Sequence, residues 1–306
     1  MNRLIRCELI KEFKKVSFKL LLVLIIISSF LTCYISYKKV DDDYETYPKV
    51  EVNEISKKQY KLIKKYNIYA SNINKINGLS NIKLNKIMDN GITLLIFSSI
   101  IMIVISSSVL GNEINKKSIK ELLTKPYKRS EILISKFIST YIIIFLLTIF
   151  IFVTYILFAY ILTKTNIFIL KDYIIYNNHI KNVSFVLKYL IKFIMNSIPV
   201  YFLSTFTIFL TTFTRNQKII IPINSILFIM SPVIFNFFLN IKFKYIIYTF
   251  IPYLDFSIFK NPYSILMLNI EYNINFNMFY GVVILIIYSI MFLLSSLFIF
   301  NEKDYY

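Results

Sequence analysis

The sequence predicts an all-α membrane protein with six transmembrane helices, an N-terminal interfacial helix, a short cytoplasmic helix and an outer hairpin before the last span. Of its 306 residues, 57% are hydrophobic and 17% are aromatic, which exceeds the apolar share of an ordinary soluble domain. Only four glycines and seven prolines are present, too few for the turns of a many-stranded sheet. Helices are therefore the expected spanning elements, because they satisfy their backbone polar groups internally.

Six apolar runs have the length of a membrane span. A helix needs about 20 largely apolar residues to cross roughly 30 Å of hydrocarbon. The predicted spans are residues 20–37, 92–110, 137–162, 193–214, 219–239 and 278–300. None of these runs contains Asp, Glu, Lys or Arg. Because ion-coupled carriers usually keep ionisable residues at membrane depth, this pattern disfavours a secondary transporter.

The first 19 residues predict a short helix in the inner interface. Apolar residues recur there at helical spacing among charged ones, at Leu4, Ile5, Leu9, Ile10 and Phe13. The basic residues before the first span resemble the start of a secretory signal. However, the run is long for such a signal, and no small-residue cleavage pattern precedes Lys38. We therefore interpret span 20–37 as an uncleaved anchor.

The distribution of Lys and Arg predicts that both chain ends are cytoplasmic. With the N-terminus inside, segments 1–19, 111–136, 215–218 and 301–306 hold 16 of the 35 basic residues in 55 positions. The segments on the other side hold 19 in 120 positions, about half that density. Heavy use of Ile, Lys, Asn, Tyr and Phe is typical of a bacterium with an AT-rich genome. The expected location is the bacterial cytoplasmic membrane.

Three outer segments separate the spans. Residues 38–91 are predicted as an extracellular helical insertion, with its helix ending at Asn77-Gly78. After the third span, residues 165–176 are predicted to form an amphipathic segment in the membrane interface. Residues 240–277 predict a re-entrant or interfacial hairpin, because the apolar stretch 245–258 is too short to cross and is interrupted by Pro252 and Asp255.

Motifs for covalent chemistry are missing from the chain. It contains no phosphate-binding loop, no metal-binding helix motif and no nucleophile elbow. Cys7, Cys33 and His179 stand alone, without metal-ligand spacing. The sequence therefore predicts no catalytic, cofactor or metal site and no enzymatic activity. The net charge of +18 is spread between apolar runs, which favours lipid headgroups over nucleic acid as the partner.

Polar residues and prolines inside the spans have two interpretations. The polar ones include Ser106, Ser107, Ser108, Asn196, Thr205, Asn224 and Asn236. We expect most of them to form hydrogen bonds between helices, and a role along a transport path is the alternative. Pro222 and Pro232 predict a kink in the fifth span, although proline is common in membrane helices.

The inner loop 111–136 is the most informative segment. Ser118 and Glu121 have the spacing of a capping box, which predicts a short helix starting there. The apolar face of this helix comprises Ile119, Leu122 and Leu123, and Pro126 closes it. Ser130 is expected to cap the third span, with Glu131 in its first turn.

This loop resembles the hallmark loop of the membrane subunits of ABC-2 exporters. That hallmark contains a Glu, a Gly-Thr pair, an apolar residue, a Leu-Leu, a Pro, an Arg and a Lys entering the next span. The matching residues are Glu113, Ile119, Leu122, Leu123, Pro126, Arg129 and Lys136. Lys117-Ser118 stands in place of the Gly-Thr pair, so the glycine-dependent turn is not matched. The charged tail 301–306 is also similar to that family.

The resemblance implies a permease driven by a separate ATP-binding subunit. It implies two ATPase copies, a homodimer or a sister permease, and ATPase coupling through Glu113, Ile119, Leu122, Leu123, Pro126 and Arg129. The implied activity is efflux of an amphipathic cargo, such as a peptide antibiotic, a drug or a lipid-like molecule, with antibiotic resistance as a consequence. The alternative is a membrane sensor or immunity protein that binds a peptide through residues 38–90 without transport. A membrane-embedded enzyme is a third interpretation, which the uncharged spans disfavour.

Overall fold

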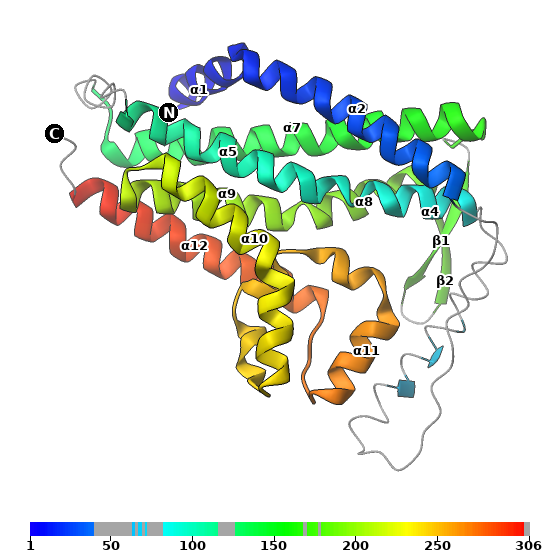
Figure 1. The fold of residues 1–306 in the computed structure, drawn as a ribbon. Coiled ribbons are helices and arrows are strands. Elements are labelled where there is room, and N and C mark those ends of the chain that lie inside the picture. Colours follow the sequence, from blue (N-terminus) through cyan, green and yellow to red (C-terminus); the bar gives the residue numbers. More distant parts are fainter. Residues whose placement is uncertain are drawn as a thin grey trace.

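The computed structural model describes residues 1–39, 63–64, 67–68, 71, 82–115, 126–167, 170–176 and 179–302. Within these ranges, six helical segments are long and apolar enough to cross a membrane, which confirms the predicted number of spans. Figure 1 shows them as a bundle with both termini at one end. We call this the terminal end, and the opposite end, which carries the strands and α11, the hairpin end.

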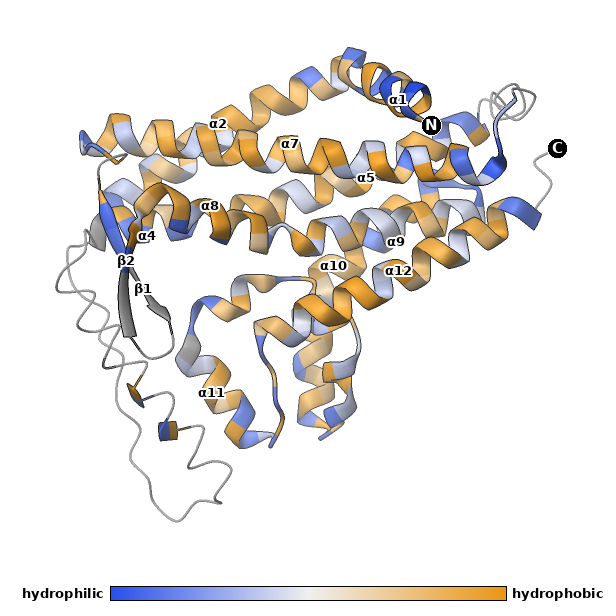
Figure 2. Cartoon of the chain, turned by 180° about the vertical axis from the view of Figure 1, so that it is seen from behind, coloured by the Kyte–Doolittle hydropathy of each residue, from blue (hydrophilic) through white to orange (hydrophobic). Residues whose placement is uncertain are grey.

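The spanning segments are all apolar, but they differ in how much of their surface is buried by the rest of the protein. They are α2 (Val16–Lys39), α4 and α5 (Ile82–Gly91 and Leu94–Asn115), α7 (Arg129–Thr163), α8 and α9 (Phe185–Asn196 and Ile198–Thr214), α10 (Gln217–Asn240) and α12 (Met278–Glu302). α5 and α9 pack against each other, and α9 also packs against α12. α2, α10 and α12 expose long rows of Ile, Leu, Val and Phe side chains (Figure 2). Such apolar surfaces suit contact with lipid.

Two helices extend further toward the terminal end than predicted. α7 begins at Arg129, eight positions before the expected start at Phe137, and α5 continues to Asn115 instead of ending at Leu110. Ser130 is not the cap of α7, because the N-cap is Lys128, whose backbone N–H donates to Glu131 at 3.3 Å. The prediction used only the apolar run and therefore made both helices too short. The charged residues at their ends are helical as well, because they have partners within the fold.

Two of the spanning segments are interrupted. Ile92 and Thr93 form a turn between α4 and α5, and Ser197 breaks the fourth span between α8 and α9, just before Pro199. The fourth helix segment also starts at Phe185, eight positions before the predicted boundary. α4 is fixed by the Tyr155 hydroxyl of α7, which donates to the Ile87 carbonyl at 3.0 Å.

A β-hairpin follows α7 and corrects the all-α prediction. β1 (Lys171–Tyr176) pairs antiparallel with β2 (His179–Ser184), with Lys171 opposite Ser184. Residues 165–176, predicted as an interfacial segment, thus contain a strand. The available sequence signal was the pair Asn177-Asn178 between two short runs of β-branched and aromatic residues.

The segment between α10 and α12 folds back onto the bundle. It consists of three 3₁₀ helices, η1 (Lys244–Tyr248), η2 (Ile251–Tyr253) and η3 (Phe256–Lys260), followed by α11 (Pro262–Glu271). η2 packs against α10 and α12. Tyr253 is buried so close to Gly281 of α12 that a Cβ there would lie 2.4 Å from the Tyr253 ring. Glycine therefore allows this close packing of the folded-back segment.

The N-terminal helix α1 (Asn2–Lys14) has an unusual distribution of side chains. Its buried residues are the acids Glu8 and Glu12, whereas Ile10 and Phe13 of the predicted apolar face are exposed. Leu4, Ile5 and Leu9 are half-buried. The prediction of a helix at this position is confirmed, but its most buried side chains are acidic, with the half-buried Leu9 packed beside them against the core.

Some predictions fall outside the described residues. Most of insertion 38–91 does, although 63–64, 67–68 and 71 are helical. Its last residues, 82–91, form α4 and continue into the second spanning segment, so the insertion ends earlier than predicted. The predicted helix 118–125 and the end of the tail, 303–306, also lie outside the described residues.

Candidate functional site

Six charged side chains gather at the terminal end of the bundle. They come from α1, from the residue that follows it, and from the facing ends of α5 and α7, which flank the loop 116–125. The members are Glu8, Lys11, Glu12, Lys15, Glu113 and Lys136. We call this group the terminal charge cluster. Because three carboxylates meet three ammonium groups, the cluster is formally neutral.

Lys136 lies at the centre of the terminal charge cluster. Its side chain is fully buried, and its Nζ lies 2.7 Å from Glu113 Oε2 and 2.8 Å from Glu8 Oε1. The same Nζ donates to the backbone carbonyl of Val109 at 3.2 Å. A buried ammonium group is tolerated only when it has such partners, so Lys136 joins α7 to both α1 and α5.

Glu113 extends the cluster from Lys136 to α1. Its Oε1 accepts a hydrogen bond from Lys11 of α1, while its Oε2 faces Lys136. Burial alone would lower the pKa of Lys11, but the Glu113 hydrogen bond and the carboxylates of Glu113, Glu8 and Glu12 hold that pKa above its ordinary value. The ammonium form of Lys11 is therefore stabilised where α1 meets α5.

Lys15 closes the cluster where α1 meets α2. Its Nζ contacts the buried carboxylate of Glu12 and donates to the Ser108 hydroxyl of α5 at 3.3 Å. The next residue, Val16, already begins α2. The cluster thus fixes the start of the first span against α5 and α7.

Further contacts tie the same end of the bundle to α10 and α12. Arg129, at the start of α7, donates to the Asn301 carbonyl of α12 at 3.1 Å. Gln217 of α10 donates to Asn112 of α5 at 3.1 Å. Gly111 allows this approach, because a Cβ there would lie 2.5 Å from Gln217 Oε1. Both ends of the loop 116–125 are therefore anchored to other helices.

The predicted coupling residues divide into two groups. Glu113 and Arg129 lie at the two flanks of the loop with the partners just described, and Pro126 is exposed in a bend before α7. Ile119, Leu122 and Leu123 lie outside the described residues. Sequence reasoning missed Glu8, Lys11, Glu12 and Lys15 as site residues. The signal for Glu8 was its spacing from Glu12, which places two carboxylates on one face of a basic helix.

The polar side chains within the spans mostly bond to their own helices. Ser106 donates to Met102, Thr205 to Phe202 and Asn196 to Lys192, all at backbone carbonyls. Asn224 of α10 instead donates to the Thr207 hydroxyl of α9. Thr205 also shares a hydrogen bond with Tyr141 of α7, and Ser108 also accepts one from Lys15. The prediction that these groups join neighbouring helices therefore holds for Asn224, Thr205 and Ser108 and fails for Ser106 and Asn196, since polar groups in a helix can reach the carbonyl three or four residues earlier.

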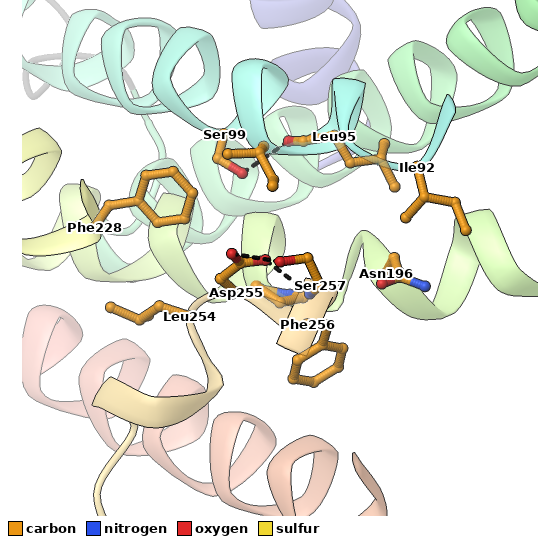
Figure 3. A pocket seen from close by; sticks show the side chains of 11 residues that line it. Ile92, Leu95, Ser99, Asn196, Phe228, Leu254, Asp255, Phe256 and Ser257 are labelled. Atoms are coloured by element: carbon orange, nitrogen blue, oxygen red, sulfur yellow. Dashed lines mark hydrogen bonds between the residues drawn. The ribbon is translucent and has the colours of Figure 1, made fainter. Parts of the chain in front are cut away.

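A second candidate is a small hollow near the middle of the bundle (Figure 3). Asp255 enters it from the folded-back segment, between α5, α9 and α10, and accepts hydrogen bonds from the backbone and hydroxyl of Ser257 at 2.8 and 2.7 Å. The hollow of about 10 Å³ is at the lower limit for one water molecule. It is too small for an amphipathic cargo, so the terminal charge cluster is the stronger candidate.

The described part of the chain is a helical protein with six segments long and apolar enough to cross a membrane, joined at one end by buried ion pairs. A family model described as "Protein of unknown function (DUF2705)" matches residues 55–306. The chain belongs to this family. No curated protein matches it.

Proposed function

We propose that this protein is the permease subunit of an ABC-2-type exporter, which moves an amphipathic cargo out across the bacterial cytoplasmic membrane. In this proposal the terminal end faces the cytoplasm, and the loop 116–125 contacts a separate ATP-binding subunit. Two ATPase copies would serve a homodimer of this chain or a pair with a sister permease. The six apolar helices and the residues that resemble the ABC-2 loop support the proposal.

The observation that carries the proposal is the pairing of the first and last residues of that loop pattern. Glu113 and Lys136 lie 2.7 Å apart, on the two helices that enter and leave the loop. This ion pair closes the base of the loop. A push on the loop would therefore move the ends of α5 and α7 together rather than spread them.

The contacts around the loop suggest how such a push would spread. Glu113 and Lys136 contact α1, and α1 leads directly into α2 through Lys15. Arg129 contacts the end of α12. Closure of the ATPases would thus be passed to the first, second, third and sixth spans, switching the path between inward and outward access as packed elements move between two arrangements.

The cargo is proposed from the composition of the spans. The exposed surfaces of α2, α10 and α12 are apolar, with mainly Ile, Leu and Val side chains and a few aromatic ones. Such surfaces suit a peptide antibiotic, a drug or a lipid-like molecule rather than a small ion, which would require polar ligands at membrane depth.

Copurification with an ATPase subunit tests the proposal. The chain is co-expressed with the ATP-binding protein of a neighbouring reading frame, and the complex is isolated in detergent. Replacing Leu122 and Leu123 together by Asp should release the ATPase, because each buried Leu contributes about 1.5–3 kcal/mol and about 1.4 kcal/mol changes affinity tenfold. The control is the same pair replaced by Met, which should retain the ATPase.

The outcomes separate the two main interpretations. Loss of the ATPase with unchanged membrane abundance of the Asp variant supports coupling through the loop. Retention of the ATPase and of transport would mean that the loop is an ordinary connection. A stable, functional complex without any ATPase would overturn the exporter proposal and favour a peptide-binding sensor or immunity protein.

A further inference from the structure

A hollow of about 380 Å³ lies at the hairpin end, where α10 and α11 finish side by side. Figures 1 and 2 show both helices ending away from the two termini. The residues that line it come from two short segments, 242–248 and 273–275. We call it the lysine hollow. No element of the proposed transport mechanism uses it.

The first wall of the lysine hollow is a rigid turn that ends α10. Lys242 has a positive φ of 58°, its N–H donates to the Leu239 carbonyl at 2.8 Å, and the Phe243 N–H donates to the Phe238 carbonyl at 2.9 Å. These are the two bonds of a Schellman motif. The rings of Phe238 and Phe243 lie 5.5 Å apart, which supplies its usual apolar contact.

The second wall repeats this construction at the end of α11. Asn273 has a φ of 48°, its N–H donates to the Ile270 carbonyl at 3.4 Å, and the Ile274 N–H donates to the Asn269 carbonyl at 3.2 Å. The Tyr272 hydroxyl donates to Asn240 Oδ1 at 3.3 Å, which links the two helix ends. Two capped ends thus hold the lining residues in fixed positions.

The charges around the lysine hollow favour an anion as its ligand. Lys242 and Lys244 are exposed, and neither pairs with a carboxylate in the part of the chain that the structure describes. No Asp or Glu lines the hollow, and the nearby Glu271 is not part of its wall. Each helix C-terminus contributes about half a negative charge, so two full positive charges outweigh both ends.

The other residues that line the hollow suit an anionic group that is attached to an apolar molecule. Tyr245 and Tyr248 are 71% and 65% exposed, and Ile247 and Ile274 form a buried floor. Tyrosines with exposed rings are enriched where a membrane meets water, with lysines reaching toward the headgroups. The exposed side-chain amides of Asn273 and Asn275 add hydrogen-bond donors.

We propose that the lysine hollow binds the phosphate of an anionic phospholipid headgroup, with Lys242 and Lys244 contacting the phosphate and Tyr245 and Tyr248 lying along the glycerol region. A soluble phosphate is the other source of the same chemistry. The proposal holds whichever side of the membrane the hairpin end faces, and it does not depend on exporter activity.

A single tryptophan can report binding, because the natural chain contains none. The full-length Tyr245→Trp protein is placed in vesicles of phosphatidylcholine containing either acyl-brominated phosphatidylglycerol or acyl-brominated phosphatidylcholine, and quenching is compared. We expect roughly a thirtyfold preference for phosphatidylglycerol, of the order that two lysines at a membrane surface provide. Adding Lys242→Gln and Lys244→Gln should remove the preference.

The control pair is Lys164→Gln with Lys171→Gln, which should keep the preference. Lys164 is a suitable control because it is also an exposed lysine with positive φ at a helix end. Inorganic phosphate added to pure phosphatidylcholine vesicles tests the soluble source. An emission change there, without a lipid preference, would assign the hollow to a soluble phosphate and overturn the lipid assignment. Equal quenching by both lipids and no response to phosphate would overturn the site.

Discussion

The ammonium group of Lys136 lies 2.8 Å from the carboxylate of Glu8, although the two residues are 128 positions apart in the sequence. This contact binds the N-terminal helix to the start of the third span. Together with Glu113, it makes the loop flanks, α1 and the start of α2 parts of one connected structure.

Replacing Lys136 by Met should destabilise the protein strongly. The carboxylates of Glu8 and Glu113 would lose their shared partner, and breaking a buried ion pair by removing one member costs about 3–5 kcal/mol. Thermal unfolding of the purified protein in detergent measures the change. Lys14→Met is the control, because Lys14 is exposed on α1, and it should change stability by less than about 0.5 kcal/mol.

A double substitution separates the ion pair from general disruption. Combining Lys136→Met with Glu113→Gln removes both an ammonium and a carboxylate, so the combined loss should be smaller than the sum of the single losses. A coupling of about 1–3 kcal/mol is expected for groups in direct contact. Strict additivity would show that the two charges act independently and would contradict the cluster.

Alkaline pH should loosen α1 through Lys11. Because the pKa of Lys11 in the folded state lies above its ordinary value of 10.5, its stabilising contribution is complete below that value and is lost as pH rises through the folded-state pKa. A spin label on the exposed Cys7, in a Cys33→Ser background, reports the mobility of α1. Mobility should rise above about pH 10.5.

Two variants of α1 identify the residue responsible. Lys11→Gln should make the label mobile at neutral pH and flatten the alkaline transition, because the Glu113 carboxylate loses its α1 partner. Lys14→Gln should leave the transition unchanged. An identical transition in all three proteins would assign the effect to another group.

The sequence predicted the number of spans because each one is a long apolar run with no internal charge. The predicted lengths of α5 and α7 were too short. Glu113 and Lys136 lie in these helices because they pair with residues that are far away in the chain. When the partners of charged residues near the end of an apolar run are unknown, the sequence pattern predicts a loop at those residues. The acidic face of α1 was missed for the same reason.

The candidate site was only partly predictable. Glu113 and Arg129 were found through a resemblance, which gives positions but no contacts. Their partners on α1 and α12 follow from the fold alone. The lysine hollow could not be predicted, because it joins residues 242–248 to 273–275 through two helix-ending turns with non-glycine residues at positive φ. Such turns have a weak sequence signal when Gly is absent.

Cysteine labelling should establish which side the terminal end faces. If that end is cytoplasmic, Lys164→Cys at the far end of α7 should react with an impermeant thiol reagent in intact cells, whereas the native Cys7 should react only after the membrane is opened. Both proteins carry Cys33→Ser, and the Lys164→Cys protein also carries Cys7→Ser, so that each has one thiol. The reverse pattern would place the loop 116–125 outside, where it cannot meet a cytoplasmic ATPase.

Gly281→Ala should weaken the packing of the folded-back segment against α12. The added Cβ would lie 2.4 Å from the buried ring of Tyr253, which is itself packed against the rings of Phe259 and Phe276. Overpacking of a filled core costs about 1–3 kcal/mol. The expected result is a lower unfolding midpoint in detergent. Ser295→Ala, at an exposed position on the same helix, should stay within about 0.5 kcal/mol of the natural protein.

The steric clash that Gly281→Ala introduces can be relieved by a substitution at Tyr253. Tyr253→Leu removes most of the ring, so the combination with Gly281→Ala should be less destabilised than the sum of the two single variants, as expected for residues in direct contact. The same unfolding measurement gives both single values and the combined one. If Gly281→Ala alone matched the natural protein while Tyr253 remained in place, the tight contact between η2 and α12 would be wrong. The folded-back segment would then have to pack on the bundle through its other contacts, such as that of Phe250 with Phe202 of α9.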